Sequence, residues 1–580
     1  MNRLFKRTDT IKYFNLDKMW DFVIDSEDKG LGEKWYENFP ETYEKIPVPS
    51  CWNNTLGYFR YVGTAWYRTD FETKCDTIFI KFEAVANECD VYIDGKHIGH
   101  HIGGFTEFSF DALNIGAGSH EMVVRVNNVI NLTDTIPHIM TDWYNYGGIN
   151  RSVEICEADS VHIKNVNTSY TINADEKSAL IRVDASVWAK DKVSDTVKIA
   201  VDGKVVYEAP FTAEGSCIFS SEDIELNDIE LWDTDNPKLY NITVFFGGID
   251  LTDRTGFRKI ECKGKDILLN GKKIILTGVC RHEHHPDWGF SMPFDLIKKD
   301  IDIIRELNCN TIRGSHYPNT KKTLDYCDET GMLFWEEIPM WGNYPEWAES
   351  FKNETFIGKA LNMHREMVSR DLNHPSIIFW GLHNEVDTTL EQTRELTKRL
   401  VNEIRALDNS RLITFASNRI NPGQACDICL DLVDVASFNY YTAWYSSSRE
   451  ESFDAFVKRT RDYVNSQAGE IPIIMSEFGG GGIKGVTTLE AQRWTETYQD
   501  ALLEGAISSY LGSGEICGTY IWQYCDINSQ FELEMSRPRG FNNKGIVDEY
   551  RRPKQAFNTV KRLYSAYNPV SKDKTKITLF

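Results

Sequence analysis

Two glutamates in the second half of the chain each stand just after a short, continuous apolar run. Glu385 follows Ile377–Trp380 in the stretch HPSIIFWGLHNEVD, and Glu477 ends the stretch PIIMSE. Apolar runs without alternation favour strands that are buried on both faces, as in a parallel sheet. Carboxylates at the C-terminal ends of such strands occupy the positions where (β/α)₈ barrels carry catalytic groups. A facing pair there suits glycoside hydrolysis, because one carboxyl group can protonate the leaving oxygen while the other attacks the anomeric carbon.

The same residues also have plainer interpretations. Asn384 and Glu385 would serve equally well to cap the helix expected after them, and either glutamate could be a structural ion-pair partner. If the catalytic interpretation holds, Asn384 is placed to hydrogen-bond the sugar 2-hydroxyl, a contact that strengthens in the transition state. Choosing between the interpretations requires a barrel that brings both carboxylates to one place.

The cluster Arg281–His285 (RHEHH) gathers residues that can bind a metal ion. It lacks the HExxH spacing of a helical zinc site and begins with a cation. We therefore expect these side chains to hydrogen-bond a substrate or to support residues that do, with metal binding as the less favoured alternative. Neither a metal nor an organic cofactor is expected.

The second half of the chain alternates apolar runs with segments of helical spacing. Eight runs end near Val279, Arg313, Glu336, Leu382, Ser417, Asn439, Ser476 and Gln523. Eight strand–helix units predict a (β/α)₈ TIM barrel over residues 259–580. The residues that follow the runs should then meet at one mouth, rich in acids and aromatics: Arg281, His282, Glu283, Ser315, His316, Glu337, Trp341, Asn384, Glu385, Asn418, Tyr440, Tyr441, Trp444, Tyr445, Glu477, Trp522 and Asp526.

Short strands separated by turns dominate the first part of the chain. Residues 1–157 predict a jelly-roll β-sandwich. Residues 158–258 repeat the pattern in a smaller unit that fits an immunoglobulin-like β-sandwich without obvious chemistry. One aromatic loop of the first domain, Thr141–Gly148, contains Asp142. This loop is either a packed turn or a segment that reaches a sugar site, and the local sequence favours packing slightly.

Length and composition limit the class of protein. A chain of 580 residues has room for about two to four domains. The net charge of −22 argues against nucleic acid and anionic membranes as partners, and no apolar stretch reaches the length of a membrane span. The basic N-terminus is not followed by an apolar signal segment. Thirteen cysteines, an odd number spread along the chain, indicate reduced thiols, so we expect a cytoplasmic protein.

Several motifs together resemble those of glycoside hydrolase family 2. Leu231–Tyr240 (LWDTDNPKLY) is similar to the signature of that family's second domain, Arg313–Pro318 (RGSHYP) to its second-strand motif, and Asn384-Glu385 to its acid/base motif. The order of jelly roll, immunoglobulin-like module and barrel also fits. The resemblance implies that Glu385 is the acid/base, that Glu477 is the nucleophile, and that the anomeric configuration is retained.

A further motif bears on the substrate. Asn542 and Lys544 resemble the Asn-x-Lys motif with which β-glucuronidases of the family bind the substrate carboxylate. An ammonium and an amide suit that role, because together they supply charge-assisted hydrogen bonds, although the local sequence alone reads as an Asn-rich turn. The resemblance also implies a set of substrate contacts: Asp142, His282, His316, Asn439, Tyr441, Tyr445, Trp522 and Arg539, with Arg537 as the alternative to Arg539.

These expectations define one function and its alternatives. We expect a bacterial, retaining, exo-acting hydrolase of terminal β-D-glucuronides that has a carbohydrate as its partner and forms a homo-oligomer. The short connection Trp341–Ala360 implies an open mouth, since several β-glucuronidases carry a longer covering loop there. The alternatives are a β-galacturonidase or β-galactosidase of the same family, or a carbohydrate-binding protein without catalysis.

Overall fold

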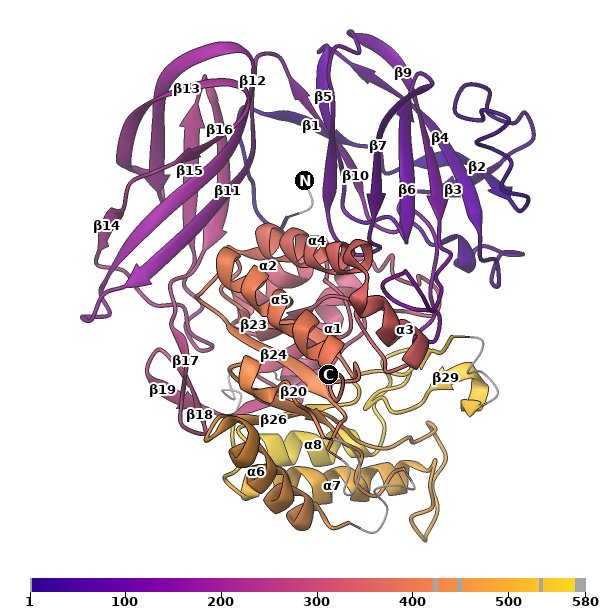
Figure 1. Cartoon of the computed structure of the whole chain (residues 1–580), viewed down its shortest axis with the longest axis vertical. Helices are drawn as coiled ribbons and strands as arrows, with labels where there is room; N and C mark the ends of the chain where they lie inside the picture. The colour runs from indigo at the N-terminus through magenta and orange to yellow at the C-terminus, as the bar shows by residue number, and fades with distance from the viewer. Residues whose placement is uncertain (1–2, 421–425, 446–450, 531–535, 569–580) are drawn as a thin grey trace, which may run out of the picture.

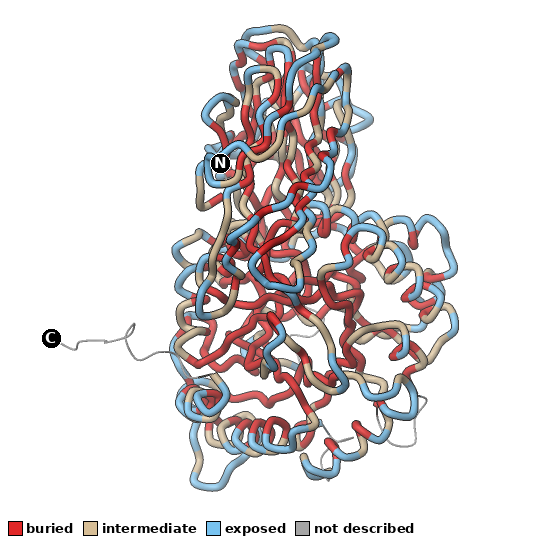
Figure 2. The backbone as a smooth tube through the Cα atoms, turned by 90° about the vertical axis from the view of Figure 1, so that its left-hand side faces the viewer, coloured by how far each residue is buried: buried red, intermediate tan, exposed pale blue. Residues whose placement is uncertain are grey.

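The computed structural model describes residues 3–420, 426–445, 451–530 and 536–568. Two β-sandwiches stand side by side above an α/β barrel (Figure 1). Figure 2 shows buried backbone running through both parts, with the exposed segments on the outside. The predicted fold class, a jelly roll and an immunoglobulin-like sandwich followed by a (β/α)₈ barrel, is confirmed.

The N-terminal sandwich packs a four-stranded antiparallel sheet (β1-β10-β5-β8) against a six-stranded one (β3-β2-β4-β9-β6-β7). Side chains such as Trp20, Val91 and Ile155 are fully buried in its core. Its strands are β1 (Lys12–Asn15), β2 (Met19–Asp25), β3 (Glu44–Pro47), β4 (Thr64–Thr73), β5 (Thr77–Phe82), β6 (Glu88–Ile93), β7 (Lys96–Ile102), β8 (Phe108–Ala112), β9 (Gly118–Asn127) and β10 (Val153–Ala158), with the short helix η1 (Trp52–Asn54).

The second sandwich is organised around β12, a strand of 24 residues. This strand pairs with β11, β13, β14 and β15, while β16 pairs with β15. Alternating buried and exposed residues, as in β14, give one face to the core and one to solvent. The strands are β11 (Val161–Ile172), β12 (Ser178–Val201), β13 (Lys204–Ser220), β14 (Ile224–Asn227), β15 (Tyr240–Phe246) and β16 (Ile249–Thr255).

The barrel closes through eight parallel strands, β20 to β27. Every residue of β23 is buried, which explains its unbroken apolar run. The strands are β20 (Leu276–Cys280), β21 (Thr311–Gly314), β22 (Leu333–Glu337), β23 (Ile377–Asn384), β24 (Leu412–Ser417), β25 (Ala436–Asn439), β26 (Ile473–Phe478) and β27 (Gly518–Ile521). A small sheet of β17 (Ile260–Lys263), β18 (Asp266–Leu269) and β19 (Lys272–Ile274) precedes them, and β28 (Ile527–Asn528) pairs with β29 (Phe541–Asn542) after them.

Helices surround the barrel, and local capping explains where several begin. Thr320 starts α2 and Asn353 starts α4, and each accepts a hydrogen bond from a backbone N–H of its helix. None of the described helices is long and apolar enough to cross a membrane. The helices are α1 (Phe294–Glu306), α2 (Lys321–Thr330), α3 (Pro345–Glu349), η2 (Ser350–Lys352), α4 (Glu354–Asp371), α5 (Glu391–Leu407), η3 (Leu430–Leu432), α6 (Phe453–Ala468), α7 (Glu496–Gly512), η6 (Pro538–Gly540) and α8 (Ala556–Tyr564).

The eight apolar runs correspond one for one to the eight barrel strands. Each predicted end lies within two residues of the end of its strand. The boundaries at 157/158 and 258/259 stay predictions. Residues 569–580, which the prediction included in the barrel domain, lie outside the described residues.

One loop of the jelly roll enters the barrel. Trp143, Tyr144 and Tyr146 are 1–3% exposed and belong to the same hydrophobic cluster as the barrel core. The backbone N–H of Tyr144 donates to the carbonyl oxygen of Asn528, at 3.1 Å. The two interpretations of this loop are therefore compatible, because its aromatic residues pack while Asp142, at its start, lines a cavity at the barrel mouth.

Candidate active site

A cavity of about 380 Å³ opens where the barrel strands end. Both glutamates singled out from the sequence line it, Glu385 just after β23 and Glu477 within β26. The full lining is Met140, Asp142, His316, Trp341, Asn343, Tyr344, Glu385, Asn418, Arg419, Asn439, Tyr440, Tyr441, Tyr445, Glu477, Trp522, Arg537 and Lys544. The cavity thus combines carboxylates, cations and flat aromatic rings, the types of groups that bind and cleave sugars.

Glu385 is held in an unusual backbone conformation. Its φ of 53° lies in the left-handed region, which costs energy for a residue with a side chain. The strain is held in place because its N–H donates to the carbonyl oxygen of Ala416 on β24, at 2.8 Å. Its Oε1 accepts a hydrogen bond from Asn439 Nδ2, at 3.0 Å. Glu385 therefore does not simply cap the following helix, because its side chain is turned into the cavity.

Glu477 is almost fully buried and receives two strong hydrogen bonds. Arg313 Nη1 donates to its Oε1 at 3.0 Å, and the Tyr441 hydroxyl donates to its Oε2 at 2.6 Å. His316 Nε2 lies 3.7 Å from the same Oε1. Both carboxylate oxygens are thus oriented by fixed donors, which prepares the side chain to react in one direction.

Arg313 connects the residues around the two glutamates. Its fully buried guanidinium pairs with Glu337, at 2.9 and 3.1 Å, and also reaches Glu477. Nη2 donates to Asn384 Oδ1 at 2.6 Å. That bond and a second one from Asn439 Nδ2, at 2.9 Å, fix the Asn384 amide so that its Nδ2 is left without a partner among the described residues.

Burial raises the pKa of both glutamates, and that of Glu477 to about 8. Arg313 opposes the shift of Glu477, whereas the nearby Glu385 adds to it. If Glu385 and Glu477 share one proton, a pKa of about 8 would place that proton on Glu477. The hydrogen bonds favour the opposite order, because Glu477 receives a guanidinium and a phenol while Glu385 receives one amide. Since charge-assisted donors stabilise a carboxylate, we assign the proton to Glu385.

Asp142 brings the jelly roll to the cavity. Its Oδ2 accepts hydrogen bonds from Arg537 Nη2 at 2.5 Å and from Asn542 Nδ2 at 2.9 Å. Its Oδ1 is buried and has no hydrogen-bond partner within the described residues. That oxygen is therefore available to accept a hydrogen bond from a sugar hydroxyl.

Lys544 contributes a buried positive charge. Its side chain is 2% exposed, and Nζ donates to the Tyr445 hydroxyl at 2.7 Å. Nζ also lies 4.5 Å from the ring centre of Tyr441 and 4.8 Å from that of Tyr445. In the described part of the chain it makes no ion pair, which is exceptional for a buried ammonium.

Comparison with known proteins agrees with this geometry. Residues 13–159, 161–258 and 260–568 match, in order, the sugar binding domain, the family's eponymous domain and the TIM barrel domain of glycosyl hydrolases family 2. The chain belongs to this family. It is a glycoside hydrolase, and the resemblance inferred from its motifs is confirmed.

Several family 2 proteins match nearly the whole chain. The β-glucuronidase of Homo sapiens is 26% identical over 95% of this chain and 90% of its own length. A β-galacturonidase structure from Eisenbergiella tayi, bound to galacturonate, is 32% identical with a TM-score of 0.90 and covers 98% of this chain and 99% of its own. The β-glucuronidase structure from Ruminococcus gnavus is 25% identical with a TM-score of 0.87, at 98% and 99% coverage.

Most of the family 2 site residues expected from the sequence share the cavity. His316 and Trp522 form part of its aromatic wall, with ring centres 5.0 Å apart. Asn384, His282 and Asn542 do not line it, although each touches a residue near it. The residues brought together are Asp142, His316, Glu385, Asn439, Tyr441, Tyr445, Glu477, Trp522 and Lys544.

The structure separates Arg539 from Arg537, the two arginines between which the sequence left a choice. Arg539 lies outside the cavity lining, because Glu549 binds its Nη1 at 2.8 Å and Asn543 accepts from its Nη2. Arg537 lines the cavity and holds Asp142. Spacing alone gave no basis for distinguishing the two arginines, because a separation of two residues in a loop carries no periodicity. Which of them faces a substrate carboxylate stays a prediction.

Some residues at the cavity had no role assigned from the sequence. Arg313 is the first residue of the RGSHYP motif. The position of Arg313 in the sequence did not indicate that its side chain binds both Glu337 and Glu477. Arg419 follows Asn418 directly after β24, so the strand-end rule that selected Asn418 would also have found it. The others are Met140, Asn343 and Tyr344.

Proposed function

We propose that the protein is a retaining, exo-acting β-uronidase that releases terminal β-D-glucuronic acid. The observation that carries this proposal is Lys544, a buried ammonium without an ion-pair partner in the described chain, set in the same cavity as Glu385 and Glu477. A buried cation is costly unless an anion meets it. The carboxylate of a uronic acid would supply that anion, whereas a neutral sugar would leave the ammonium unpaired.

In the first half of the proposed reaction, Glu477 attacks the anomeric carbon. The carboxylate oxygen forms a bond to that carbon as the bond to the aglycone oxygen breaks, and Glu385 gives its proton to the departing oxygen. Arg313 and the Tyr441 hydroxyl hold Glu477 ionised and aimed. The product is a covalent glycosyl-enzyme and a free aglycone alcohol.

In the second half, Glu385 works in reverse. Now ionised, it takes a proton from a water molecule whose oxygen attacks the anomeric carbon, and Glu477 leaves as a carboxylate. Two inversions at one carbon give net retention, as is general for the family. Glu385 ends protonated, ready for the next cycle.

Residues in the cavity, and Asn384 directly behind its wall, would position the sugar ring. The unpaired Nδ2 of Asn384 supports a contact with the 2-hydroxyl, next to the reacting carbon. The unpaired Oδ1 of Asp142 would accept from a hydroxyl farther round the ring. Trp522 offers an aromatic surface for the sugar's C–H groups.

A β-galacturonide is the second candidate substrate, because a galacturonate-bound β-galacturonidase is among the most similar solved structures. The two sugars differ only at the 4-hydroxyl. The deciding experiment compares kcat/KM on the p-nitrophenyl β-D-glucuronide, galacturonide, galactoside and glucoside. We expect the glucuronide to be preferred. A preference for the galacturonide selects the second candidate, and a preference for either neutral glycoside refutes the uronidase proposal.

We also propose that the protein acts in the cytoplasm of a bacterium as a homo-oligomer. Buried thiols such as Cys280, Cys309 and Cys327, none in a disulfide, support a reducing compartment. Fractionation of the source cells and light scattering of the purified protein test the two parts separately. Recovery outside the cytoplasm, or a monomeric mass, would contradict the corresponding part.

A further inference from the structure

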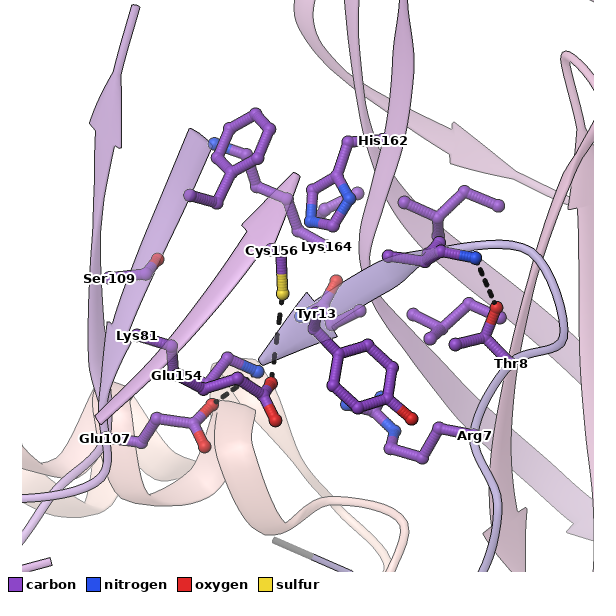
Figure 3. A pocket seen from close by; sticks show the side chains of 16 residues that line it. Arg7, Thr8, Tyr13, Lys81, Glu107, Ser109, Glu154, Cys156, His162 and Lys164 are labelled. Atoms are coloured by element: carbon purple, nitrogen blue, oxygen red, sulfur yellow. Dashed lines mark hydrogen bonds and ion pairs between the residues drawn. The ribbon is translucent and has the colours of Figure 1, made fainter. Parts of the chain in front are cut away.

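Lys544 differs from the cations that line the cavity between the two β-sandwiches (Figure 3). There Lys164 pairs with Asp111 at 2.7 Å, and Arg7 pairs with Asp253 at 3.4 Å. Lys544 makes no ion pair in the described part of the chain. Because no carboxylate of that part fixes its ammonium group, the position of the group depends on the backbone that carries it.

Lys544 lies in a short loop after β29, residues 543–545, which we call the lysine loop. Asp526 Oδ1 accepts a hydrogen bond from the backbone N–H of Gly545 at 2.9 Å, and Lys554 Nζ donates to the carbonyl oxygen of the loop's first residue at 3.1 Å. Asp526 and Lys554 are buried and pair with each other at 2.7 Å. This ion pair holds one side of the lysine loop to the barrel.

Gln499, in the first turn of α7, holds the other side of the lysine loop. Its side chain is fully buried, and its Nε2 donates to the carbonyl oxygens of Gly480 and Gly545, each at 3.0 Å. The carbonyl oxygen of Lys544, at 3.3 Å, shares one of the two hydrogens. Gly480 belongs to residues 479–482, the glycine loop, which follows the strand that contains the proposed nucleophile. One side chain thus joins the loop behind the nucleophile to the loop that carries the buried ammonium group.

Close packing leaves room only for glycine where the two loops meet. The backbone N–H of Gly482 donates to the carbonyl oxygen of Asn543 at 2.9 Å. A Cβ atom on Gly482 would lie 2.9 Å from Gln499 Oε1, and one on Gly480 would lie 2.9 Å from the Trp444 ring. Both distances are shorter than the contact of about 3.5–4.0 Å that carbon atoms prefer. The glycine loop can therefore approach Gln499 and the lysine loop closely enough for these hydrogen bonds to form.

The same contacts fix the orientation of the Gln499 amide. A flipped amide would direct its oxygen at three carbonyl oxygens, and that arrangement is repulsive because carbonyl oxygens only accept hydrogen bonds. In the observed orientation, Oε1 is buried and has no hydrogen-bond partner among the described residues. The donor capacity of this amide is thus directed entirely at the two loops.

We propose that Gln499 is a positioning residue that sets the place of the Lys544 ammonium group relative to Glu477. A uronide must bring its anomeric carbon to Glu477 and its carboxylate to Lys544 at the same time, so the separation of the two side chains decides how well it binds. Loss of the amide would remove the donor that the three carbonyl oxygens share and would free one side of the lysine loop. The inference rests on the proposed function, because it takes Lys544 as the group that binds the substrate carboxylate.

Gln499→Met tests the inference, because methionine has a similar length but cannot donate a hydrogen bond. We expect kcat/KM on p-nitrophenyl β-D-glucuronide to fall by about three- to tenfold, mainly through a higher KM, as loss of one neutral hydrogen bond would give. On p-nitrophenyl β-D-galactoside, which has no carboxylate, we expect a change of less than about twofold. In the Lys544→Ala background, Gln499→Met should reduce activity on the glucuronide by less than about twofold, because the group that Gln499 positions is already absent.

Ile507→Val is the matched control for a change in stability. Ile507 is fully buried in the barrel core about two turns further along α7. Its replacement should lower the melting temperature without altering kcat/KM on either substrate by more than about twofold. If Gln499→Met does not fold, Gln499→Asn repeats the measurements with an amide that is too short to reach both loops.

Three results would each overturn the inference: unchanged kinetics on the glucuronide, equal losses on both substrates, or the same loss with and without Lys544. The wild type tests the proposed function separately. A wild type that prefers the galactoside refutes the proposed function and this inference with it. A wild type that prefers the glucuronide, combined with any of the three results, refutes the inference alone.

Discussion

Lys544 is the residue on which substrate choice should depend most. Replacing it with alanine removes the one cavity cation that has no ion-pair partner in the described structure, without breaking an ion pair of the protein itself. A hydrogen bond to a charged group contributes about 1.5–3 kcal/mol. At about 1.36 kcal/mol per factor of ten, kcat/KM on p-nitrophenyl β-D-glucuronide should fall by about 10- to 160-fold.

The matched measurement uses a neutral glycoside and a control lysine. Activity on p-nitrophenyl β-D-galactoside should be unchanged or higher in Lys544→Ala, because the unpaired ammonium no longer faces an uncharged sugar. Lys484→Ala should affect neither substrate, since that side chain donates to Pro553 outside the cavity. The melting temperature of Lys544→Ala should not fall, because burial of an unpaired charge is itself destabilising. Equal losses on both substrates would refute the carboxylate contact.

Three further predictions concern the chemistry and the scaffold. The Arg313 guanidinium lowers the pKa of Glu477, and Arg313→Gln removes this effect. The acid limb of the plot of kcat/KM against pH should therefore move to higher pH by about one unit or more. An acid limb that does not move would contradict the ion pair between Arg313 and Glu477. Glu385→Ala should keep glycosylation by activated aryl glycosides and regain turnover with azide, giving a β-glycosyl azide by NMR; an α-azide would disprove retention. Asp300→Ala should destabilise the protein by about 3–5 kcal/mol, because among the described residues it leaves the buried Arg551 without an ion pair and Arg281 with only the more distant Glu283, at 3.9 Å; the half-exposed Asp302→Ala should cost at most about 1 kcal/mol in the same urea titration.

The barrel could be predicted because buried parallel strands leave a simple trace in a sequence. The run Ile377–Trp380 is continuous because β23 is covered on both faces, and the polar residues that follow it mark the strand's end. The same rule, applied eight times, placed Glu385 and Glu477 at one mouth. Strand ends in a barrel converge by geometry, so a local pattern carried information about distant neighbours.

Other parts of the site depend on contacts that no local pattern encodes. Asp142 was ambiguous because its loop is packed and functional at once. Arg313 appeared to be one more strand residue, although its partners come from β22, β23 and β26. The conformation of the loop, in which Arg539 has a φ of 64°, determines that Arg537 and not Arg539 lines the cavity. Such features follow from tertiary packing, which overrides short-range spacing.

The contribution of the jelly roll to the catalytic cavity has a consequence for synthesis of the protein. Asp142 meets its two partners 395 and 400 positions later in the chain, and Asn145 meets Gln530 across 385. At about 5–20 residues per second, a ribosome needs about 20–80 s to deliver those partners. During that interval the barrel core is not yet complete. The aromatic side chains of Trp143, Tyr144 and Tyr146 therefore stay exposed to solvent on the incomplete chain. The catalytic cavity is thus among the last parts of the native structure to be completed. The enzyme cannot become active before the segment that contains Asn542 has been synthesised.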